Sequence, residues 1–300
     1  MATLKFSDSR GSTSGTFTPG SAEPNSGAKP LLVLIHGGGV NNAYFDNAAH
    51  SVPRDFSNAG YNVLNVARIG YGGNAISKSS SPLFDAAPLY SGFINQVYKE
   101  NHGGKGGVII IGHSLGAATS LIIAALEGDN IPLIGVSALG CVPKREPPQF
   151  ILDAIAAFPD VDRLQMGEVD DEYFRNFLGA PEFFDVSGFD KLSSIYEGAP
   201  KNELVEWTTP ATYDRFVNDV APGVKVPLQF LAAEIELGWP GIEQGTPIFE
   251  EVAKWFTNTE YLDAGILLGG AHNYEFSKNS QRLHNRRLQF IESIIRDCRS

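Results

Sequence analysis

Cysteine is scarce in this chain, and the residues that usually bind metal ions are scattered. The 300 residues include two cysteines, Cys141 and Cys298, which form no Cys-x-x-Cys pair, and the six histidines are dispersed. Zinc sites and disulfide scaffolds need closely spaced ligands or several cysteines. The sequence therefore predicts no metal site, and two distant cysteines fit a reducing compartment.

Long apolar runs and an excess of basic charge are also missing. No stretch approaches the roughly 18 apolar residues of a membrane-spanning helix, and the segment from Met1 to Phe6 is too polar for a secretory signal. The net charge of −11 disfavours nucleic acids and anionic membranes through repulsion. We therefore expect a cytoplasmic protein that acts on a small molecule.

A phosphate-binding loop is absent as well. The segment Gly103-Gly104-Lys105-Gly106-Gly107 contains a Gly-Lys step, but it lacks the following Ser or Thr and the first glycine at the required spacing. The segment predicts a turn. No organic cofactor is expected.

The sequence does contain a regular alternation of short apolar runs and helical stretches. Runs that predict strands cover 31–35, 61–66, 107–111, 131–138, 225–232 and 260–268. Helices are expected over 41–59, 83–100, 115–127, 246–257 and 279–297. Residues Ser7 to Lys29 predict an antiparallel hairpin that joins the sheet. This order is typical of an α/β fold with a doubly wound, mostly parallel sheet.

A tight turn follows one of these strands and carries a serine. The segment Gly112-His113-Ser114-Leu115-Gly116 lies between the apolar run 107–111 and the small, apolar helical stretch from Ala117 to Leu126. This order of strand, turn and helix is that of a nucleophile elbow, in which a strained backbone lifts the serine toward a base. Ser114 is therefore the candidate nucleophile.

An upstream glycine loop strengthens this interpretation. The strand predicted at 31–35 ends in His36-Gly37-Gly38-Gly39, and with the elbow this segment resembles the α/β-hydrolase superfamily. The resemblance implies an oxyanion hole made by the backbone N–H groups of Gly38 and Leu115. His36 is expected to fix the loop rather than to act as a base.

The resemblance also implies that the catalytic histidine follows the serine in the chain. Two histidines qualify. His272 comes directly after the strand predicted at 260–268, where the family carries its base. His284 lies in a charged, helical stretch and is expected to face solvent. We predict that His272 is the base.

The acid should end a strand between the elbow and His272. Glu234 and Glu236 both follow the apolar run 225–232. Family members read small residue, two variable residues, acid and then proline, which assigns the acid to Glu236 with Pro240 after it. Glu234 is the second choice. Most relatives use Asp at this position, so the acid is the least conventional member of the site.

Three aromatic residues outside the triad are weaker candidates for contacting substrate. Tyr71 lies in the family-like segment 66–73, although packing on the sheet would explain it equally well. Trp239 and Tyr274 lie close to the predicted acid and base in the sequence. Tyr71, Trp239 and Tyr274 would form the specificity pocket if the interval 143–222 does not.

The longest interval between predicted strands, 143–222, interrupts the hydrolase-like core of 1–142 and 223–300. The family inserts a helical cap over the elbow at this point. The interval holds 16 acidic and 7 basic residues, so it carries most of the net charge. It is also rich in aromatic residues, among them Phe174, Phe177, Phe183, Phe184 and Trp207. We expect a cap whose aromatics attach it to the core or line an apolar substrate site.

These features predict a serine hydrolase that cleaves an uncharged, moderately apolar ester, thioester or lactone through an acyl-enzyme on Ser114. Three alternatives remain open: acyl transfer or macrolactone closure as in polyketide release, a hydroxynitrile lyase-like reaction of the same triad, and a hydrolase-like ligand receptor. Epoxide hydrolases and dehalogenases of this superfamily carry Asp at the elbow, so Ser114 argues against both.

Overall fold

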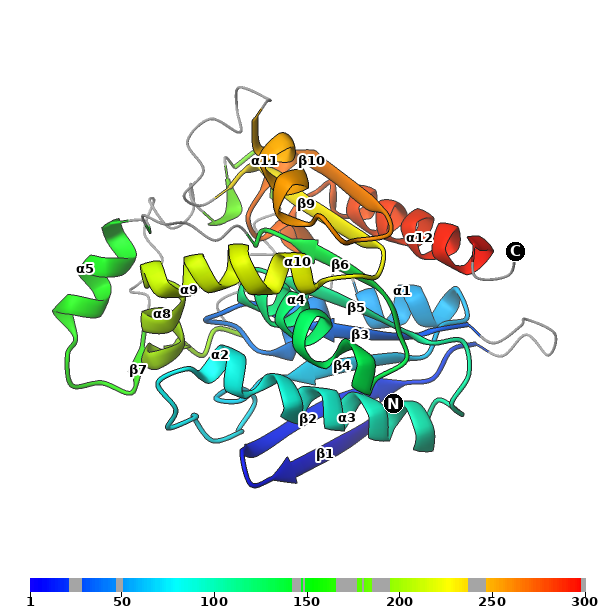
Figure 1. The fold of residues 1–300 in the computed structure, drawn as a ribbon, viewed down its shortest axis with the longest axis horizontal. Helices are drawn as coiled ribbons and strands as arrows, with labels where there is room; N and C mark the ends of the chain where they lie inside the picture. Colours follow the sequence, from blue (N-terminus) through cyan, green and yellow to red (C-terminus); the bar gives the residue numbers. More distant parts are fainter. Residues whose placement is uncertain are drawn as a thin grey trace.

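A single eight-stranded sheet forms the centre of the molecule (Figure 1). The computed structural model describes residues 1–21, 29–46, 51–141, 147, 149–165, 177–179, 181–184, 195–236 and 247–297. The strands of the sheet are β1 (Ala2–Asp8), β2 (Gly11–Thr18), β3 (Leu31–Ile35), β4 (Val63–Ala67), β5 (Val108–His113), β6 (Leu133–Leu139), β9 (Leu228–Ile235) and β10 (Leu262–Ala271).

The strand order is β1-β2-β4-β3-β5-β6-β9-β10. The hairpin of β1 and β2 is antiparallel and joins β4 in antiparallel register, whereas all later neighbours are parallel. Strands β3, β4 and β5 are buried throughout their length, as expected of parallel strands covered on both faces. The predicted α/β, doubly wound and mostly parallel fold is confirmed.

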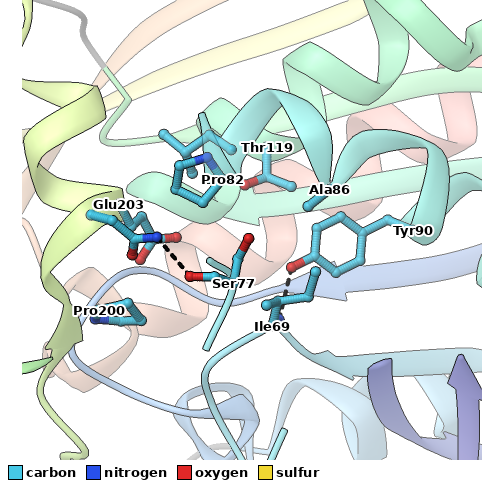
Figure 2. A pocket seen from close by; sticks show the side chains of 10 residues that line it. Ile69, Ser77, Pro82, Ala86, Tyr90, Thr119, Pro200 and Glu203 are labelled. Atoms are coloured by element: carbon cyan, nitrogen blue, oxygen red, sulfur yellow. Dashed lines mark hydrogen bonds between the residues drawn. The ribbon is translucent and has the colours of Figure 1, made fainter. Parts of the chain in front are cut away.

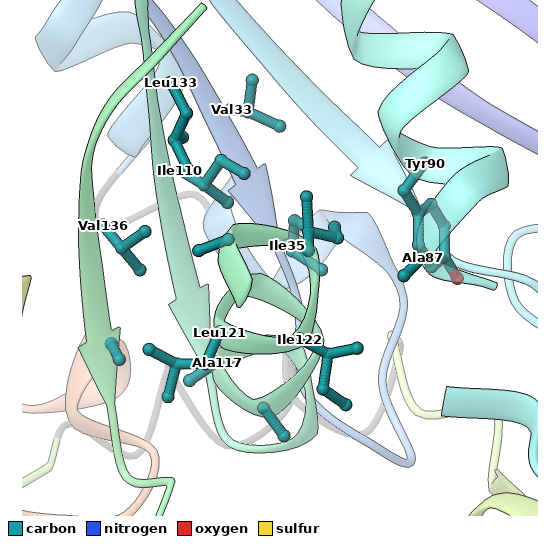
Figure 3. Close-up of a cluster of buried hydrophobic side chains, with 14 of the residues drawn as sticks. Val33, Ile35, Ala87, Tyr90, Ile110, Ala117, Leu121, Ile122, Leu133 and Val136 are labelled. Carbon is teal, nitrogen blue, oxygen red and sulfur yellow. The ribbon is translucent and has the colours of Figure 1, made fainter. Parts of the chain in front are cut away.

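Helices cover both faces of the sheet. They are η1 (Asn42–Phe45), α1 (Val52–Asn58), α2 (Pro82–Asp85), α3 (Ala87–Glu100), α4 (Leu115–Glu127), η2 (Gly128–Asn130), α11 (Pro247–Trp255), η6 (Tyr274–Phe276) and α12 (Ser280–Asp297). One apolar cluster joins α3, α4 and α11 to one face, and a second joins α1 and α12 to the other. Figure 3 shows the first, where Ile35, Ile110 and Val136 of the strands face Leu121 and Ile122 of α4.

The chain between β6 and β9 contains the remaining described elements. They are α5 (Gln149–Ala157), β7 (Arg163–Leu164), β8 (Ala199–Pro200), α8 (Lys201–Trp207), α9 (Pro210–Arg215), η4 (Phe216–Val220) and α10 (Ala221–Gly223). Figure 1 shows α5, α8 and α9 together at the left of the molecule. Phe216 and Val220 are fully buried in the first apolar cluster, so the last part of this interval packs on the core.

Three expectations need correction. The hairpin expected within 7–29 spans residues 2–18. Its first strand precedes most of the glycine- and serine-rich stretch on which the prediction is based. The helix expected over 41–59 is divided into the separate elements η1 and α1. The helix expected over 83–100 is divided at Ala86, which precedes Pro88 in the first turn of α3.

Candidate active site

Ser114 occupies the sharp turn between β5 and α4. Its backbone angles are φ 54° and ψ −126°, and it is the only non-glycine residue with positive φ among the residues that the structure describes. A side chain rarely adopts such a conformation unless the surrounding structure imposes it, and strain of this kind clusters at functional sites. The position and the backbone of Ser114 are those of a nucleophile elbow.

The glycines on either side of Ser114 allow this turn. A methyl group at Gly116 would lie 2.1 Å from the carbonyl oxygen of Ile35, and one at Gly112 would lie 2.5 Å from the Cα atom of Ala117. Both distances are shorter than any real contact of such atoms. Strand β5, helix α4 and the end of β3 can therefore meet only because these positions carry no side chain.

The glycine loop after β3 lies directly against the elbow. A methyl group at Gly37 would be 2.9 Å from Cβ of Ser114, and one at Gly38 would be 2.9 Å from Cδ1 of Leu115. Leu115 is the first residue of α4, so its N–H group has no carbonyl partner within the helix. His36 is fully buried, and its Nδ1 donates to the carbonyl of Gly37 at 2.8 Å, as expected of a loop-fixing residue.

The predicted acid and base are in direct contact at the ends of neighbouring strands. Glu236 Oε2 accepts a hydrogen bond from His272 Nδ1 at 2.7 Å, and its Oε1 accepts the N–H of Ala233 at 3.0 Å. Both residues of this acid–base pair are buried. Glu234, the second choice, is bonded instead to the N–H of Gly269 at 2.7 Å, in an irregular part of β10. Geometry thus assigns the contact with histidine to Glu236.

The acid–base pair lies beside the elbow. Ser114 N–H donates to the carbonyl of Leu139 at 2.8 Å, and a methyl group at the next residue, Gly140, would lie 3.1 Å from atoms of both members of the pair. His113 Nε2 donates to the carbonyl oxygen of His272 at 2.8 Å. Burial, and then the neighbouring His272, hold the pKa of His113 well below its usual value, so His113 is neutral. The structure therefore brings all three triad candidates to one edge of the sheet.

A family model described as the Alpha/beta hydrolase family matches residues 32–258, a range that includes the elbow and Glu236. The chain belongs to this family. A search of curated protein sequences finds no match.

Solved structures of this fold align with nearly the whole chain. A thermophilic esterase from Thermogutta terrifontis has a TM-score of 0.65 at 14% identity, covering 98% of this chain and 99% of its own. A monoglyceride lipase variant from Saccharomyces cerevisiae has a TM-score of 0.72 at 13% identity, with coverage of 98% and 94%. An epoxide hydrolase from Vigna radiata has 0.65 at 14%, with 97% of each chain. At such identities the likeness concerns the fold.

The described parts of the interval 143–222 contact the candidate site from two sides. On the histidine side, the carbonyl of Phe177 accepts the N–H of Asn273 at 2.7 Å, and the Phe177 ring lies 5.7 Å from the ring of His272. Phe184 forms a β-bridge with Ser277 in the same loop. On the opposite side, residues 195–203 contact the glycine loop, as described below.

The expectation that His284 faces solvent is wrong. His284 is fully buried on α12, and its Nε2 is 2.7 Å from Oε2 of Glu275, three residues after His272. Arg287, one helical turn later on α12, forms an ion pair with the same carboxylate. Burial alone would raise the pKa of Glu275, but Arg287 and then His284 lower it to about 2. Part of the charged stretch is therefore buried, because α12 packs on the sheet next to residues 272–277, the histidine loop.

The three weaker candidates have different surroundings. Tyr71 is fully buried, and its hydroxyl donates to Glu203 at 2.8 Å. Tyr274 is also buried, and its hydroxyl donates to the carbonyl of Leu268 at 2.7 Å. Trp239 lies outside the described residues, as do Pro240 and Phe174. Tyr71 and Tyr274 therefore make contacts within the protein.

Cys141 is the cysteine that the structure describes, and it is buried. Burial, with the Glu236 carboxylate adding to it, raises the pKa of the Cys141 thiol well above its usual range, so this thiol is a poor nucleophile. Within the described ranges no three His, Cys, Asp or Glu side chains are grouped as metal ligands would be. Among the same residues, no helix has the length and apolar character to span a membrane.

Proposed function

We propose that this hydrolase cleaves carboxylic esters, thioesters or lactones through an acyl-enzyme on Ser114. One observation carries the proposal: the strained serine at the end of β5 shares an edge of the sheet with a buried, hydrogen-bonded glutamate and histidine. A serine hydroxyl needs an adjacent base to become a nucleophile, and the base needs a partner that fixes its orientation. This arrangement offers both.

The proposed steps follow from these contacts. A carboxylate only accepts hydrogen bonds, so Glu236 holds the proton of His272 on Nδ1 and leaves Nε2 free to act as the base. Nε2 takes the proton of Ser114 as Oγ attacks the carbonyl carbon. The imidazolium then gives this proton to the leaving alcohol or thiol. Water, activated by the same nitrogen, attacks the acyl-enzyme and releases the acid.

The negative charge of the tetrahedral intermediate needs hydrogen-bond donors. We assign this oxyanion hole to the backbone N–H groups of Gly38 and Leu115, which belong to segments in contact beside Ser114. Donors fixed before the reaction stabilise the transition state without reorganisation, and one such donor is worth roughly 10²- to 10³-fold in kcat.

The surroundings favour an uncharged, moderately apolar acyl group. Phe177 lies edge-on to His272, and further aromatics follow it in the interval 143–222. The excess of acidic residues in this interval disfavours anionic substrates. We therefore propose that 143–222 is a cap over the site and that its aromatics near the histidine loop select the substrate. A serine in place of aspartate separates this site from those of epoxide hydrolases.

The test of this function is covalent labelling followed by turnover. A fluorophosphonate should label the wild-type protein on the peptide that contains Ser114, whereas Ser114→Ala should not react. Turnover should then be measured on nitrophenyl esters of increasing chain length, on thioesters and on lactones, with and without an added alcohol as acceptor. If the protein is labelled but turns over none of these substrates, a receptor-like role remains. If product forms only when the alcohol acceptor is present, acyl transfer is favoured over hydrolysis.

A further inference from the structure

The glycine loop that carries Gly38 is held at both ends. At its start, His36 Nε2 accepts the N–H of Arg68 at 3.2 Å, while Nδ1 donates to Gly37. At its end, the N–H of Gly39 donates to the hydroxyl of Tyr71 at 3.2 Å. Gly38 lies between these two anchors. The direction of its N–H group therefore depends on both of them.

Tyr71 connects this loop to a buried charge pair. Its hydroxyl accepts from Gly39 and donates to Glu203 Oε2 at 2.8 Å, while Arg68 forms an ion pair with the other carboxylate oxygen. Burial, and then the Glu203 charge, raise the pKa of Tyr71 well above its usual value. Tyr71 therefore keeps its proton at neutral pH and can serve as acceptor and donor at once.

The interval 143–222 supports the second anchor and adds contacts of its own to the loop. Glu203 is part of α8, and the segment just before it pairs with the loop through a β-bridge between Val40 and Tyr196. The carbonyl of Gly39 accepts the N–H of Glu197 at 2.8 Å. Both backbone polar groups of Gly39 are thus bonded to Tyr71 or to the returning end of this interval.

The cavity that the described residues form beside Glu203 is too small for a substrate. Figure 2 shows Glu203 and Pro200 facing Pro82, Ala86 and Tyr90 across a cavity of about 10 Å³. A single water molecule already needs roughly this volume. The Glu203 carboxylate therefore acts on protein groups.

We propose that Tyr71 and Glu203 are positioning residues that align the Gly38 N–H of the oxyanion hole and couple it to the returning segment of the insertion, residues 195–203. The role in catalysis rests on the proposed function. The positioning itself does not, because it concerns the backbone of residues 36–41. Any displacement of the returning segment would reach the oxyanion hole through Gly39.

Amide hydrogen exchange tests the positioning without any assumption about the reaction. Tyr71→Phe keeps the ring but removes the acceptor of the Gly39 N–H. We expect exchange in peptides covering 36–41 to rise roughly fivefold or more. Glu203→Gln should act in the same direction. It also leaves the buried charge of Arg68 unpaired, so Tyr71→Phe, which retains all charges, is the decisive variant if Glu203→Gln fails to fold.

Glu206→Gln is the matched control. Glu206 lies three residues later on α8 and is equally buried, but it accepts the N–H of Leu83 at 2.7 Å at the start of α2. Glu206→Gln should therefore raise amide exchange near residues 81–86 and leave exchange at 36–41 unchanged. Unchanged exchange at 36–41 in Tyr71→Phe, or an equal rise in Glu206→Gln, would overturn the proposal.

Kinetics on a nitrophenyl ester test whether Tyr71 affects the stabilisation of the oxyanion. Tyr71→Phe should lower kcat roughly tenfold and leave KM within about twofold, because a misaligned donor costs less than the loss of one. A raised KM with unchanged kcat would instead make Tyr71 a substrate contact and overturn the positioning role. A wild-type protein that fluorophosphonate does not label would refute the proposed function, while the exchange data would still decide the positioning.

Discussion

The two halves of the candidate site are built in different ways. The nucleophile half, formed by the ends of β3 and β5, is a set of backbone contacts that glycines at 37, 38, 112 and 116 make possible. The acid–base half, at the ends of β9 and β10, depends on the hydrogen bond between Glu236 and His272 and on the separate bonds of the nearby Glu275 with His284 and Arg287. The first half is therefore sensitive to added volume, and the second to lost charge or polarity.

The largest expected effect tests whether the two halves act as one unit. Ser114→Ala and His272→Ala should each lower kcat by about 10⁴-fold or more, because neither residue can act without the other. The double variant should be little worse than either single one. Ester hydrolysis measures this, with circular dichroism as the control for folding. Near-normal activity of Ser114→Ala would falsify the proposed mechanism.

The next effect sharpens the acid–base half. Glu236→Gln should lower kcat by roughly 10³-fold or more, because it removes the charge that orients His272 and stabilises its cationic form. Glu234→Gln should cost less than about tenfold, since Glu234 is bonded to the backbone of Gly269. The two carboxylates differ by only two positions, so each is the control for the other. The reverse order of activities would transfer the acid to Glu234.

A third prediction concerns the charge beneath the histidine loop. The pKa of Glu275 in the folded protein is about 2, below the value of 4.5 for an unperturbed carboxyl. As the pH falls, the Glu275 carboxyl is protonated in the unfolded chain at a higher pH than in the folded protein. The stabilisation is therefore complete above about pH 4.5 and is lost as the pH falls toward 2. At neutral pH, Glu275→Gln should lower the free energy of unfolding by roughly 3 kcal/mol, because it leaves the buried Arg287 unpaired.

Urea unfolding between about pH 7 and pH 3 measures this effect, and the gap between wild type and Glu275→Gln should narrow toward acid. Asp8→Asn, which removes an ion pair with Arg10 at the surface turn of the first hairpin, is the control and should matter little at any pH. A gap that stays constant with pH would show that Glu275 contributes packing rather than charge.

The smallest expected effect compares aromatics of the insertion that lie near to and far from the acid–base half. Substituting Phe177 or Phe184 by Leu should change relative kcat/KM among acyl chain lengths by about tenfold, with little effect on acetate esters. Trp207 packs edge-on to the buried Phe216, so Trp207→Leu should lower stability and leave selectivity unchanged. An unchanged selectivity profile in the first two variants would make the insertion structural.

The geometry of the nucleophile half could be predicted from the sequence because its signals are local. A strand, four glycines and a serine within short segments determine which atoms meet, so the proximity of Ser114, Gly38 and Leu115 could be predicted from spacing and family resemblance, while their roles stay predictions. The strand expected at 31–35 and the helix at 115–127 match the structure residue for residue. Apolar strands buried on both faces leave little ambiguity about their limits.

The acid–base half and its supports were less accessible. Spacing favoured Glu236, but only the structure shows that Glu234 bonds to β10 instead. The partnerships of Arg68 with Glu203 and of Glu275 with Arg287 join residues whose charge predicts exposure, and nothing local in the sequence says that they are buried together. His284 was misplaced for the same reason.

The adjacency of β6 and β9 in the sheet has a consequence for grafting experiments. These neighbours pair directly, although the interval 143–222 lies between them in the chain, so strand pairing alone would tolerate replacement of that interval. The contacts of Glu197 and Glu203 set a narrower limit. A transplanted segment that ends at residue 194 would leave the contacts of Gly39 with Tyr71 and Glu197 in place. One that extends to 222 would also need a carboxylate that accepts the Tyr71 hydroxyl and pairs with Arg68.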